Sequence, residues 1–430
     1  MVLNLIYLAT LVAAFPLLLY RSLRHKKYRE GWGAKLLGLV PDLPSPPAGV
    51  KRIWFHAVSV GEVNLLKTLV AELDASGEGW EFVVSSTSKT GYALAVKLFA
   101  DRVPVFYCPL DFTWSVKRAL RRIKPDALAL VELEVWPNLI CRARRYGAKV
   151  VIVNGRVADG SFLWYRRAKR FFARVFASVD LVVAQDELAA SRFRELVPDQ
   201  SRVLVSGSLK FDGAQTDRDN PGTRRLAQLA GITESDVVFL CGSTQAPEEE
   251  AGLDVYRSLR ADYPNLRLIL APRHPERFAE VARLLDASEF AWTRRSTLTL
   301  GDTCERILLV DAVGELAAWW GTAQIGFVGG SWGSRGGQNM LEPAGYGVAV
   351  SFGPNTQNFR TIVESLLSAR AAVVAANPEE MRAFVKRCLA EPEYRRALGL
   401  AARNLTLSNQ GATKRTVDAI ASVMKGDSVV

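Results

Sequence analysis

Histidine is scarce in this sequence, and its cysteines form no recognisable pattern. Only three histidines occur, His25, His56 and His274, which nearly excludes a histidine-rich metal centre. The five cysteines lie far apart, without a C-x-x-C pair, at positions 108, 141, 241, 304 and 388. This spacing argues against a disulfide framework or a zinc site and fits a reducing compartment.

The sequence also lacks long Lys/Arg tracts with interleaved aromatic residues and any recognisable nucleic-acid module. Its formal net charge is nevertheless +11. A basic balance suits nucleic acid, anionic membranes or phosphorylated substrates. We therefore expect no nucleic-acid partner and favour anionic lipid and phosphate.

Charge is absent from the N-terminal residues 1–20, and basic residues follow at once in the basic and Pro-rich segment 21–50. About 20 apolar residues span a bilayer, and flanking cations stay on the cytoplasmic side. The pattern predicts a membrane anchor over 1–20 with the remaining chain in the cytoplasm. The alternative is a buried N-terminal helix, because Asn4 and Pro16 weaken the span.

Two alternations of strands and helices follow, and 430 residues suffice for two domains. The expected strands lie at 52–56, 81–86, 103–107, 126–132, 149–153, 180–184 and 203–206, and then at 237–241, 267–271, 306–310, 323–328 and 348–351. Such alternation predicts parallel sheets covered on both faces. We therefore expect an α/β protein with two Rossmann-like domains facing across a cleft.

The predicted boundaries are an N-terminal domain over 51–206, a polar linker over 207–223 and a C-terminal domain over 224–400. The helical segment 401–430 is expected to pack back on the N-terminal domain. In folds of this kind ligands bind beyond the carboxyl ends of the strands, so the residues that follow each strand are the candidates for function.

Two junctions of the second domain could hold a phosphate. Gly242, Ser243 and Thr244 precede a helix that Pro247 opens, where free N–H groups and a hydroxyl suit an anion; simple helix capping is the alternative. Arg273 and His274 follow the next strand. The planar arginine fork can clamp phosphate, whereas a surface salt bridge is the alternative.

The richest junction is VGGSWGSRGGQNMLEPAGYG over 328–347, where five glycines precede Asn339. Glycine lets the backbone approach a ligand, and Asn339 and Glu342 can bind polar groups of a nucleotide. The stretch matches neither a Walker loop nor a G-x-G-x-x-G fingerprint. Gly330 and Ser331 are possible donor contacts, and a plain turn is the alternative.

In the first domain, acidic residues stand where strands end. Glu132 and Glu134 close the 126–132 strand, where buried charge needs a partner or a purpose, and solvent exposure is the alternative. Glu62 follows Gly61 in HAVSVGEVN, at the start of a helix. It is either a functional carboxylate or one of the glutamates that any first helical turn favours. Lys210 stands where the linker begins.

The segment 164–180, WYRRAKRFFARVFASVD, combines an apolar helical stripe with five basic residues. Such a helix can lie in an anionic interface. A core-packed helix with a basic outer face is the favoured alternative.

The motifs HAVSVGE, VELEVWPN, VNGR, GSLKFD, APRHPERF, GGS and GGQNMLEPA occur in the order found in the 3-deoxy-D-manno-octulosonic acid (Kdo) transferases. The chain resembles this family from its N-terminus through YREGWG (28–33) to about residue 360. Gln338 stands where the family more often has histidine, and Gly155 where alanine is usual.

The resemblance implies an inverting GT-B glycosyltransferase of lipopolysaccharide biosynthesis at the inner membrane. It would move Kdo from CMP-Kdo to a lipid A precursor of the lipid IVA type, without metal or cofactor. It also implies that Glu62 is the general base, supported by Glu132 and Lys210. The implied nucleotide contacts are Pro272, Arg273, Val313, Gly314, Glu315, Asn339, Met340, Leu341 and Glu342. We expect the helix dipole to keep Glu62 ionised.

Two rival functions are a sugar-nucleotide epimerase of similar architecture and a membrane-tethered scaffold with a degenerate nucleotide site. The epimerase needs no membrane anchor. The scaffold does not explain the polar residues at the strand ends.

Overall fold

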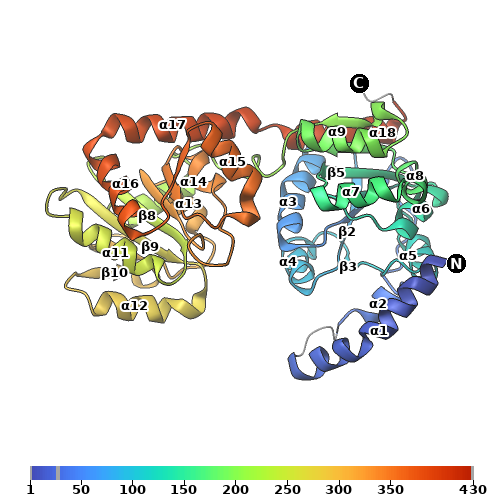
Figure 1. Ribbon diagram of the computed structural model, residues 1–430, viewed down its shortest axis with the longest axis horizontal. Helices are drawn as coiled ribbons and strands as arrows, with labels where there is room; N and C mark the ends of the chain where they lie inside the picture. The colour runs from blue at the N-terminus through green and yellow to red at the C-terminus, as the bar shows by residue number, and fades with distance from the viewer. Residues whose placement is uncertain (1, 26–29, 428–430) are drawn as a thin grey trace. The chain divides into compact units, whose positions relative to one another are not determined.

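The computed structural model describes residues 2–25 and 30–427. The chain forms two compact units, one made of Met1–Gly213 and Gln410–Val430 and the other of Ala214–Asn409. Each unit holds a parallel seven-stranded sheet between helices (Figure 1). The predicted α/β class with two parallel-sheet domains is confirmed.

The sheet of the first unit has the order β3-β2-β1-β4-β5-β6-β7, with every pair parallel. Its strands are β1 (Lys51–His56), β2 (Trp80–Ser86), β3 (Val105–Tyr107), β4 (Ala127–Val131), β5 (Lys149–Gly155), β6 (Leu181–Ala184) and β7 (Val203–Val205). The central strands are apolar almost throughout because both faces of the sheet are covered.

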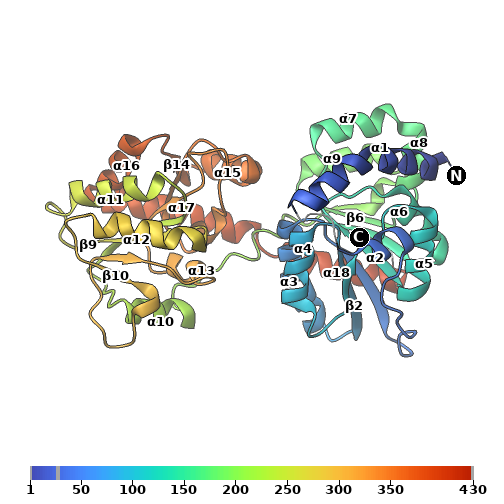
Figure 2. The same cartoon turned by 90° about the horizontal axis from the view of Figure 1, so that it is seen from below.

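The helices around this sheet are α2 (Trp32–Leu37), α3 (Val60–Ala75), α4 (Lys89–Phe99), α5 (Thr113–Ile123), α6 (Pro137–Tyr146), α7 (Asp159–Arg167), α8 (Lys169–Phe176), α9 (Glu187–Leu196) and α18 (Ala412–Lys425). Alternate strand residues serve two separate cores. Trp54 packs with residues of α5, α6, α8 and α9, whereas Ile53 and Phe55 pack with residues of α3, α4 and α18. Figure 2 shows the same helices from below.

The N-terminal segment forms helix α1 (Val2–His25), which lies against the first unit through its polar side chains. The Asn4 side chain accepts hydrogen bonds from Thr113, and the Tyr7 hydroxyl donates to Asp111 Oδ2 at 3.0 Å. Within the part of the chain that the structure describes, no helix is long and apolar enough to cross a bilayer. The predicted spanning anchor over 1–20 is therefore not supported. Of the basic residues expected to flank it, Lys26, Lys27 and Arg29 lie outside the described residues.

The sheet of the second unit has the order β10-β11-β9-β8-β12-β13-β14, again parallel. Its strands are β8 (Val237–Thr244), β9 (Leu266–Pro272), β10 (Trp292–Arg294), β11 (Ile307–Leu309), β12 (Ile325–Val328), β13 (Ala349–Phe352) and β14 (Ala372–Val374). Its helices are α10 (Pro221–Leu229), α11 (Glu248–Leu259), α12 (Phe278–Asp286), α13 (Leu316–Trp320), α14 (Leu341–Gly345), α15 (Arg360–Ser368), α16 (Pro378–Ala390) and α17 (Pro392–Asn409).

Two local differences from the sequence prediction have clear causes. Segment 164–180 is not one helix, because Ala168 leaves helical geometry with φ −94° and ψ 29° between α7 and α8. Phe172, Val175 and Phe176 face the core, as the favoured alternative required. The predicted linker also ends early, because Asn220 caps α10 by accepting a hydrogen bond from the Thr223 backbone N–H.

Candidate active site

A small cavity in the first unit brings together carboxylates that are far apart in the sequence. It has a volume of about 280 Å³ and lies where β4 and β5 end and α3 begins. Its polar lining consists of Glu62, Glu132, Glu134, Arg156, Ser161 and Tyr165. Parallel strands of one sheet deliver these residues to the same edge, which is why strand-end positions meet.

Glu62 forms a capping box with Ser59 at the start of α3. Its Oε2 accepts a hydrogen bond from the Val58 backbone N–H at 2.8 Å, and its Oε1 accepts one from the Ser59 hydroxyl at 2.7 Å. The Ser59 hydroxyl in turn accepts from the Glu62 backbone N–H. The alternative interpretation, in which Glu62 is a glutamate that stabilises the first helical turn, is therefore correct in part. The same side chain still lines the cavity.

The ionisation of Glu62 differs from the sequence expectation. Burial raises the pKa of Glu62, and the nearby charge of Glu132 raises it further, although hydrogen bonds from Val58 and Ser59 oppose both effects. The expected depression by the helix dipole is wrong in direction, because desolvation outweighs it. A raised pKa makes this carboxylate a stronger base than an exposed glutamate.

Glu132 is held by two cations. Its Oε1 lies 3.3 Å from Lys210 Nζ, and its Oε2 lies 3.2 Å from Arg156 Nη2. The backbone φ of Glu132 is 59°. A positive φ is unusual for residues other than glycine, and such strained conformations cluster at functional sites. The structure therefore joins the predicted pair Glu132 and Lys210.

Glu134 carries the largest carboxylate pKa shift in the cavity. Burial raises the pKa of Glu134 to about 7, helped by the charges of Glu62 and Glu132. Strand β4 ends at Val131, one residue before the end of the predicted strand, so the two-residue spacing between Glu132 and Glu134 does not follow a strand. Both side chains nevertheless line the cavity.

Sequence reasoning assigned no role to Arg156 or Tyr165. Arg156 ends the motif VNGR directly after β5, which was the available signal. His56, by contrast, is fully buried, its Nδ1 lies 2.9 Å from the Ser85 hydroxyl, and burial lowers its pKa to about 4. The neutral imidazole is thus buried at the end of β1 and does not line the cavity.

The glycine-rich loop of the second unit is organised by one buried carboxylate, Glu248. Its Oε2 accepts backbone hydrogen bonds from Gln245 and Gly330, both at 2.8 Å. Its Oε1 accepts from Ser331 at 3.0 Å and Trp332 at 3.2 Å. Burial raises the pKa of Glu248, although the hydrogen bonds from these four backbone N–H groups oppose the effect. Sequence reasoning saw Glu248 only as part of a helix start.

Several predicted donor contacts at this loop have packing roles instead. β8 continues through Thr244, so no free loop follows residue 241. A side chain at Gly242 would collide with Trp320. Ser331 is fully buried, donates its hydroxyl to Val328 O and accepts from the Gly353 N–H. These contacts argue against a ligand at either residue. Trp320 occupies the space beside Gly242, and the Ser331 hydroxyl already has two hydrogen-bond partners within the chain.

Ser243 and Thr244 retain features of a ligand loop. Ser243 has a φ of 56°, again uncommon outside glycine. The Thr244 hydroxyl is buried and has no hydrogen-bond partner among the described residues. Gly330, beside it, has a φ of 64°, and its N–H is bound to Glu248.

Arg273 follows Pro272, the last residue of β9, and its side chain is exposed. Its Nε donates to Gln338 Oε1 at 3.2 Å, so two predicted features of separate motifs touch. Asn339 Nδ2 donates to Glu342 Oε1 at 3.1 Å, while Met340 and Leu341 are buried. Burial raises the pKa of Glu342.

The predicted nucleotide contacts Val313, Gly314 and Glu315 lie directly before α13. Val313 is 77% exposed, Gly314 has a φ of 93°, and Glu315 pairs with Arg295 at 2.7 Å. Arg295 is a partner that sequence reasoning missed, because it lies twenty residues upstream without a motif. Over residues 2–25 and 30–427, no three His, Cys, Asp or Glu side chains are grouped as metal ligands would be.

Comparison with known proteins finds a matching family model and several similar sequences. A sequence model described as 3-Deoxy-D-manno-octulosonic-acid transferase (kdotransferase) matches residues 30–213. A 3-deoxy-D-manno-octulosonic acid transferase of Haemophilus influenzae is 31% identical over 418 residues, covering 96% of this chain and 96% of its own. One of Bordetella pertussis is 34% identical, covering 88% of each chain.

Solved structures show the same architecture. A UDP-GlcNAc 2-epimerase from Neisseria meningitidis bound to UDP-GlcNAc has a TM-score of 0.58 at 13% identity, covering 87% of this chain and 100% of its own. A glycosyltransferase from Rickettsia africae has a TM-score of 0.54 at 12% identity, covering 87% of this chain and 98% of its own. At such identity the likeness concerns the fold.

Proposed function

Because the chain belongs to the family of 3-deoxy-D-manno-octulosonic acid (Kdo) transferases, we propose that its first unit activates an acceptor and its second unit binds the sugar donor. The protein is a glycosyltransferase that transfers Kdo in lipopolysaccharide biosynthesis. The donor of this proposal is CMP-Kdo, and the acceptor is a lipid A precursor of the lipid IVA type. The observation that carries the proposal is the cluster of Glu62, Glu132 and Glu134 in one cavity.

Glu62 is the proposed general base. An acceptor hydroxyl that attacks the anomeric carbon must lose its proton, and a carboxylate within hydrogen-bond reach can take it. The backbone N–H of Val58 and the Ser59 hydroxyl fix the orientation of the Glu62 carboxylate. Its raised pKa supports proton uptake, provided that the group is ionised when the acceptor binds.

Glu132 and Lys210 support the transition state in this proposal. The departing sugar resembles an oxocarbenium ion, which a carboxylate stabilises. Lys210 and Arg156 hold the Glu132 carboxylate in place through two ion pairs. Direct displacement by the acceptor inverts the anomeric configuration.

The donor nucleotide is proposed to bind at the carboxyl edge of the second sheet. In this proposal Arg273 faces the phosphate, and Asn339 and Glu342 offer polar groups to the nucleotide. The Thr244 hydroxyl, which has no partner within the described chain, adds a donor at the same edge. The proposed reaction needs no metal or cofactor. The phosphate diester of the CMP-sugar carries a single charge, and Arg273 and backbone N–H groups can stabilise this charge and the charge of the CMP monoester as it departs.

Membrane contact belongs to the same proposal, through surface residues instead of a spanning helix. Leu5, Ile6, Val12 and Phe15 of α1 are each more than half exposed, while Asn4 and Tyr7 face the domain. On α7 and α8, Trp164 and Phe171 are exposed beside a run of basic side chains. Exposed apolar residues with cations suit anionic inner-membrane lipids.

A single incubation tests the function. The protein is mixed with CMP-Kdo and lipid IVA, and the products are analysed by mass spectrometry. We expect release of CMP and lipid IVA heavier by whole Kdo units, which are thereby counted. A donor sugar that chromatography shows to be epimerised, at unchanged mass and without transfer, would indicate an epimerase instead, and unchanged substrates would indicate a scaffold.

A further inference from the structure

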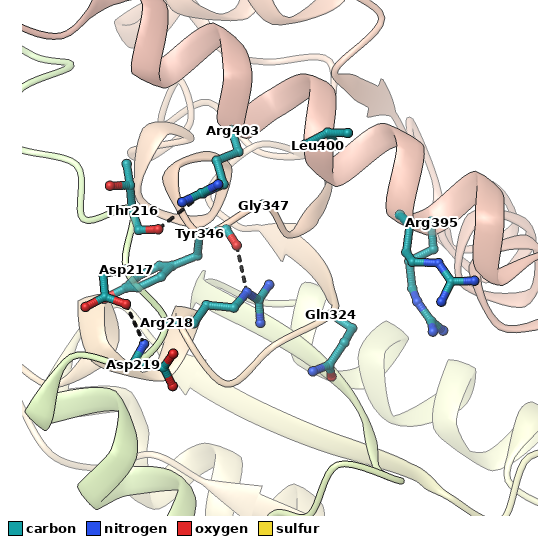
Figure 3. A pocket seen from close by; sticks show the side chains of 11 residues that line it. Thr216, Asp217, Arg218, Asp219, Gln324, Tyr346, Gly347, Arg395, Leu400 and Arg403 are labelled. Carbon is teal, nitrogen blue, oxygen red and sulfur yellow. Dashed lines mark hydrogen bonds between the residues drawn. The ribbon is translucent and has the colours of Figure 1, made fainter.

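A second cavity lies on the opposite edge of the sheet that is proposed to bind the donor. It has a volume of about 540 Å³ and is formed wholly by residues of the second unit (Figure 3). Gln324 precedes β12, and Tyr346 and Gly347 precede β13, so the cavity opens at the amino-terminal ends of the strands. The proposed nucleotide contacts instead follow the carboxyl ends. The two sites are therefore distinct.

The cavity is rich in unpaired cations, and we call it the arginine pocket after its lining residues Arg218, Arg395, Arg396 and Arg403. Arg396 pairs with Glu393. Among the described residues, Arg218, Arg395 and Arg403 have no carboxylate within the 4.0 Å of a salt bridge. The arginine pocket thus presents more positive charge than the chain neutralises.

The two acidic residues of the lining form no salt bridge with these cations, and four arginines against two aspartates leave the lining net positive. Asp217 Oδ1 accepts a hydrogen bond from the Asp219 backbone N–H at 2.8 Å, which closes a local turn. The Asp219 carboxylate lies 3.9 Å from Arg224 of α10 and is highly exposed. Both carboxylates therefore serve the chain around α10.

Arg218 is fixed in place with part of its fork free. Its Nε donates to Tyr346 O at 2.7 Å, and its Nη1 donates to Gly321 O at 3.0 Å. Within the described chain its Nη2 makes no hydrogen bond. Burial, together with the nearby charge of Arg403, lowers the pKa of Arg218 to about 10. A half-buried cation without a carboxylate partner is costly, and an anion would offset that cost.

The other arginines project from one helix. Figure 3 shows Arg395, Leu400 and Arg403 along α17. Positions 396, 400 and 403 share a helical face. Arg403 is oriented by its Nε, which donates to Thr216 O at 3.2 Å. Guanidinium groups from α17 and from the 216–219 segment therefore line the same cavity from different sides.

We propose that the arginine pocket binds a phosphate-bearing anion of at least two negative charges, such as a diphosphate or a phosphomonoester. One carboxylate cannot neutralise three unpaired guanidinium groups, whereas phosphate oxygens accept several N–H donors and match the planar fork. The volume exceeds that of a bare ion and admits a small phosphorylated molecule. This site goes beyond Kdo transfer and does not depend on it.

The test uses the full chain and inorganic pyrophosphate as the probe, with binding measured by titration calorimetry. Arg395→Gln combined with Arg403→Gln should weaken binding by at least about tenfold, since charge-assisted hydrogen bonds are lost. Arg403→Lys keeps the charge but loses the fork, so it should be intermediate. Arg382→Gln, an exposed residue of α16, is the charge-matched control and should bind as the wild type does.

Pyrophosphate can also reach the nucleotide site, so Arg273→Ala is measured in parallel. Binding that survives Arg273→Ala and is lost in the double variant supports the proposal. Binding lost in Arg273→Ala but intact in the double variant overturns it, as does a wild type that binds neither pyrophosphate nor vesicles containing phosphatidic acid. If only the vesicles bind, and the double variant abolishes that, the phosphate comes from a lipid headgroup instead of a soluble molecule.

Discussion

At the scale of single residues, Glu62 serves both the helix and the proposed chemistry. A capping-box glutamate uses its carboxylate to satisfy N–H groups ahead of the helix. Glu62 accepts hydrogen bonds from the Val58 N–H and the Ser59 hydroxyl, yet it also lines the cavity that holds Glu132 and Glu134. The cap positions the carboxylate, and burial together with the charge of Glu132 raises its affinity for a proton.

Replacing Glu62 by glutamine separates these two roles. Glu62→Gln keeps an acceptor for the cap but removes the proton acceptor. We expect turnover to fall by roughly 10²–10⁴-fold, because general-base help has that magnitude. The melting temperature and the affinity for CMP-Kdo should change little, since donor residues lie in the other unit. Initial rates with lipid IVA measure the effect.

The matched control is Glu72→Gln, which removes the same charge from the same helix away from the cavity. It should retain wild-type turnover. If Glu62 were only a capping residue, its substitution would cost about 0.3–1 kcal/mol of stability and little activity. A folded Glu62→Gln variant with near-normal turnover would therefore refute the base assignment.

Glu134 makes a prediction for pH dependence. Its pKa is about 7 in the folded chain and near 4.5 when unfolded, so between these values the native state binds a proton that the unfolded chain has lost. The contribution of Glu134 to stability is therefore full at low pH and is lost as pH rises through 7. Glu134→Gln should flatten the fall in unfolding free energy between about pH 5 and about pH 8.

Urea unfolding across that range measures the slope for both chains. An unchanged slope in Glu134→Gln would show that another group titrates there. Glu78→Gln, at a surface ion pair with Lys425, serves as the control.

Residue roles could be predicted where a motif carried them. Glu132 and Lys210 were expected together, and the structure pairs them. Arg156, Arg295 and Glu248 were missed, because their partners lie in distant segments that only the fold brings close. The direction of the Glu62 pKa shift was also missed, since burial is a tertiary property that position in a helix does not reveal.

At the scale of elements, helix α11 and the glycine-rich loop act as one unit through Glu248. Four backbone N–H groups from two segments point at one buried carboxylate. Hydrogen bonds to a charged group contribute about 1.5–3 kcal/mol each when buried. The loop geometry near Gly330 therefore depends on a residue that itself starts a helix.

Glu248→Gln should loosen the loop, because the amide NH₂ group cannot accept from backbone donors. We expect the affinity for CMP to fall by about tenfold or more, the equivalent of one such bond. Calorimetry with CMP measures it. The exposed neighbour Glu250→Gln is the control and should bind normally. A Glu248→Gln variant that loses stability but binds CMP as the wild type does would contradict the link to the donor site.

The regular elements were largely predictable, and the exceptions are short or contextual. The apolar runs at 52–56 and 149–153 became β1 and β5 because burial on both faces demands such runs. β10 and β14 were missed; each has three residues and lies at a sheet edge with one paired side, although the equally short edge strands β3 and β7 were expected. The break at Ala168 carries no glycine or proline signal.

At the scale of the whole molecule, the chain leaves the first unit at Gly213 and re-enters it at Gln410. Asp212 receives the returning backbone, since its Oδ1 accepts from the Gly411 N–H at 2.7 Å. Helix α18 then buries Val417, Ile420 and Val423 against α3 and the sheet. The first domain is therefore completed only by the end of the sequence.

A chain that ends at Asn409 tests this arrangement. Full burial of a large apolar side chain contributes about 1.5–3 kcal/mol. Summed over Val417, Ile420, Val423 and Met424, this upper estimate is comparable with the unfolding free energy of a typical domain, about 5–15 kcal/mol. We expect the first unit of the truncated chain to be cut readily by trypsin and transfer to be lost. The second unit comprises Ala214–Asn409 and should still bind CMP.

A chain ending at Asp427 keeps α18 and should resist trypsin as the full chain does. A protease-resistant first unit in the chain ending at Asn409 would show that α18 is an accessory to this core, and loss of CMP binding would show that the second unit depends on the first.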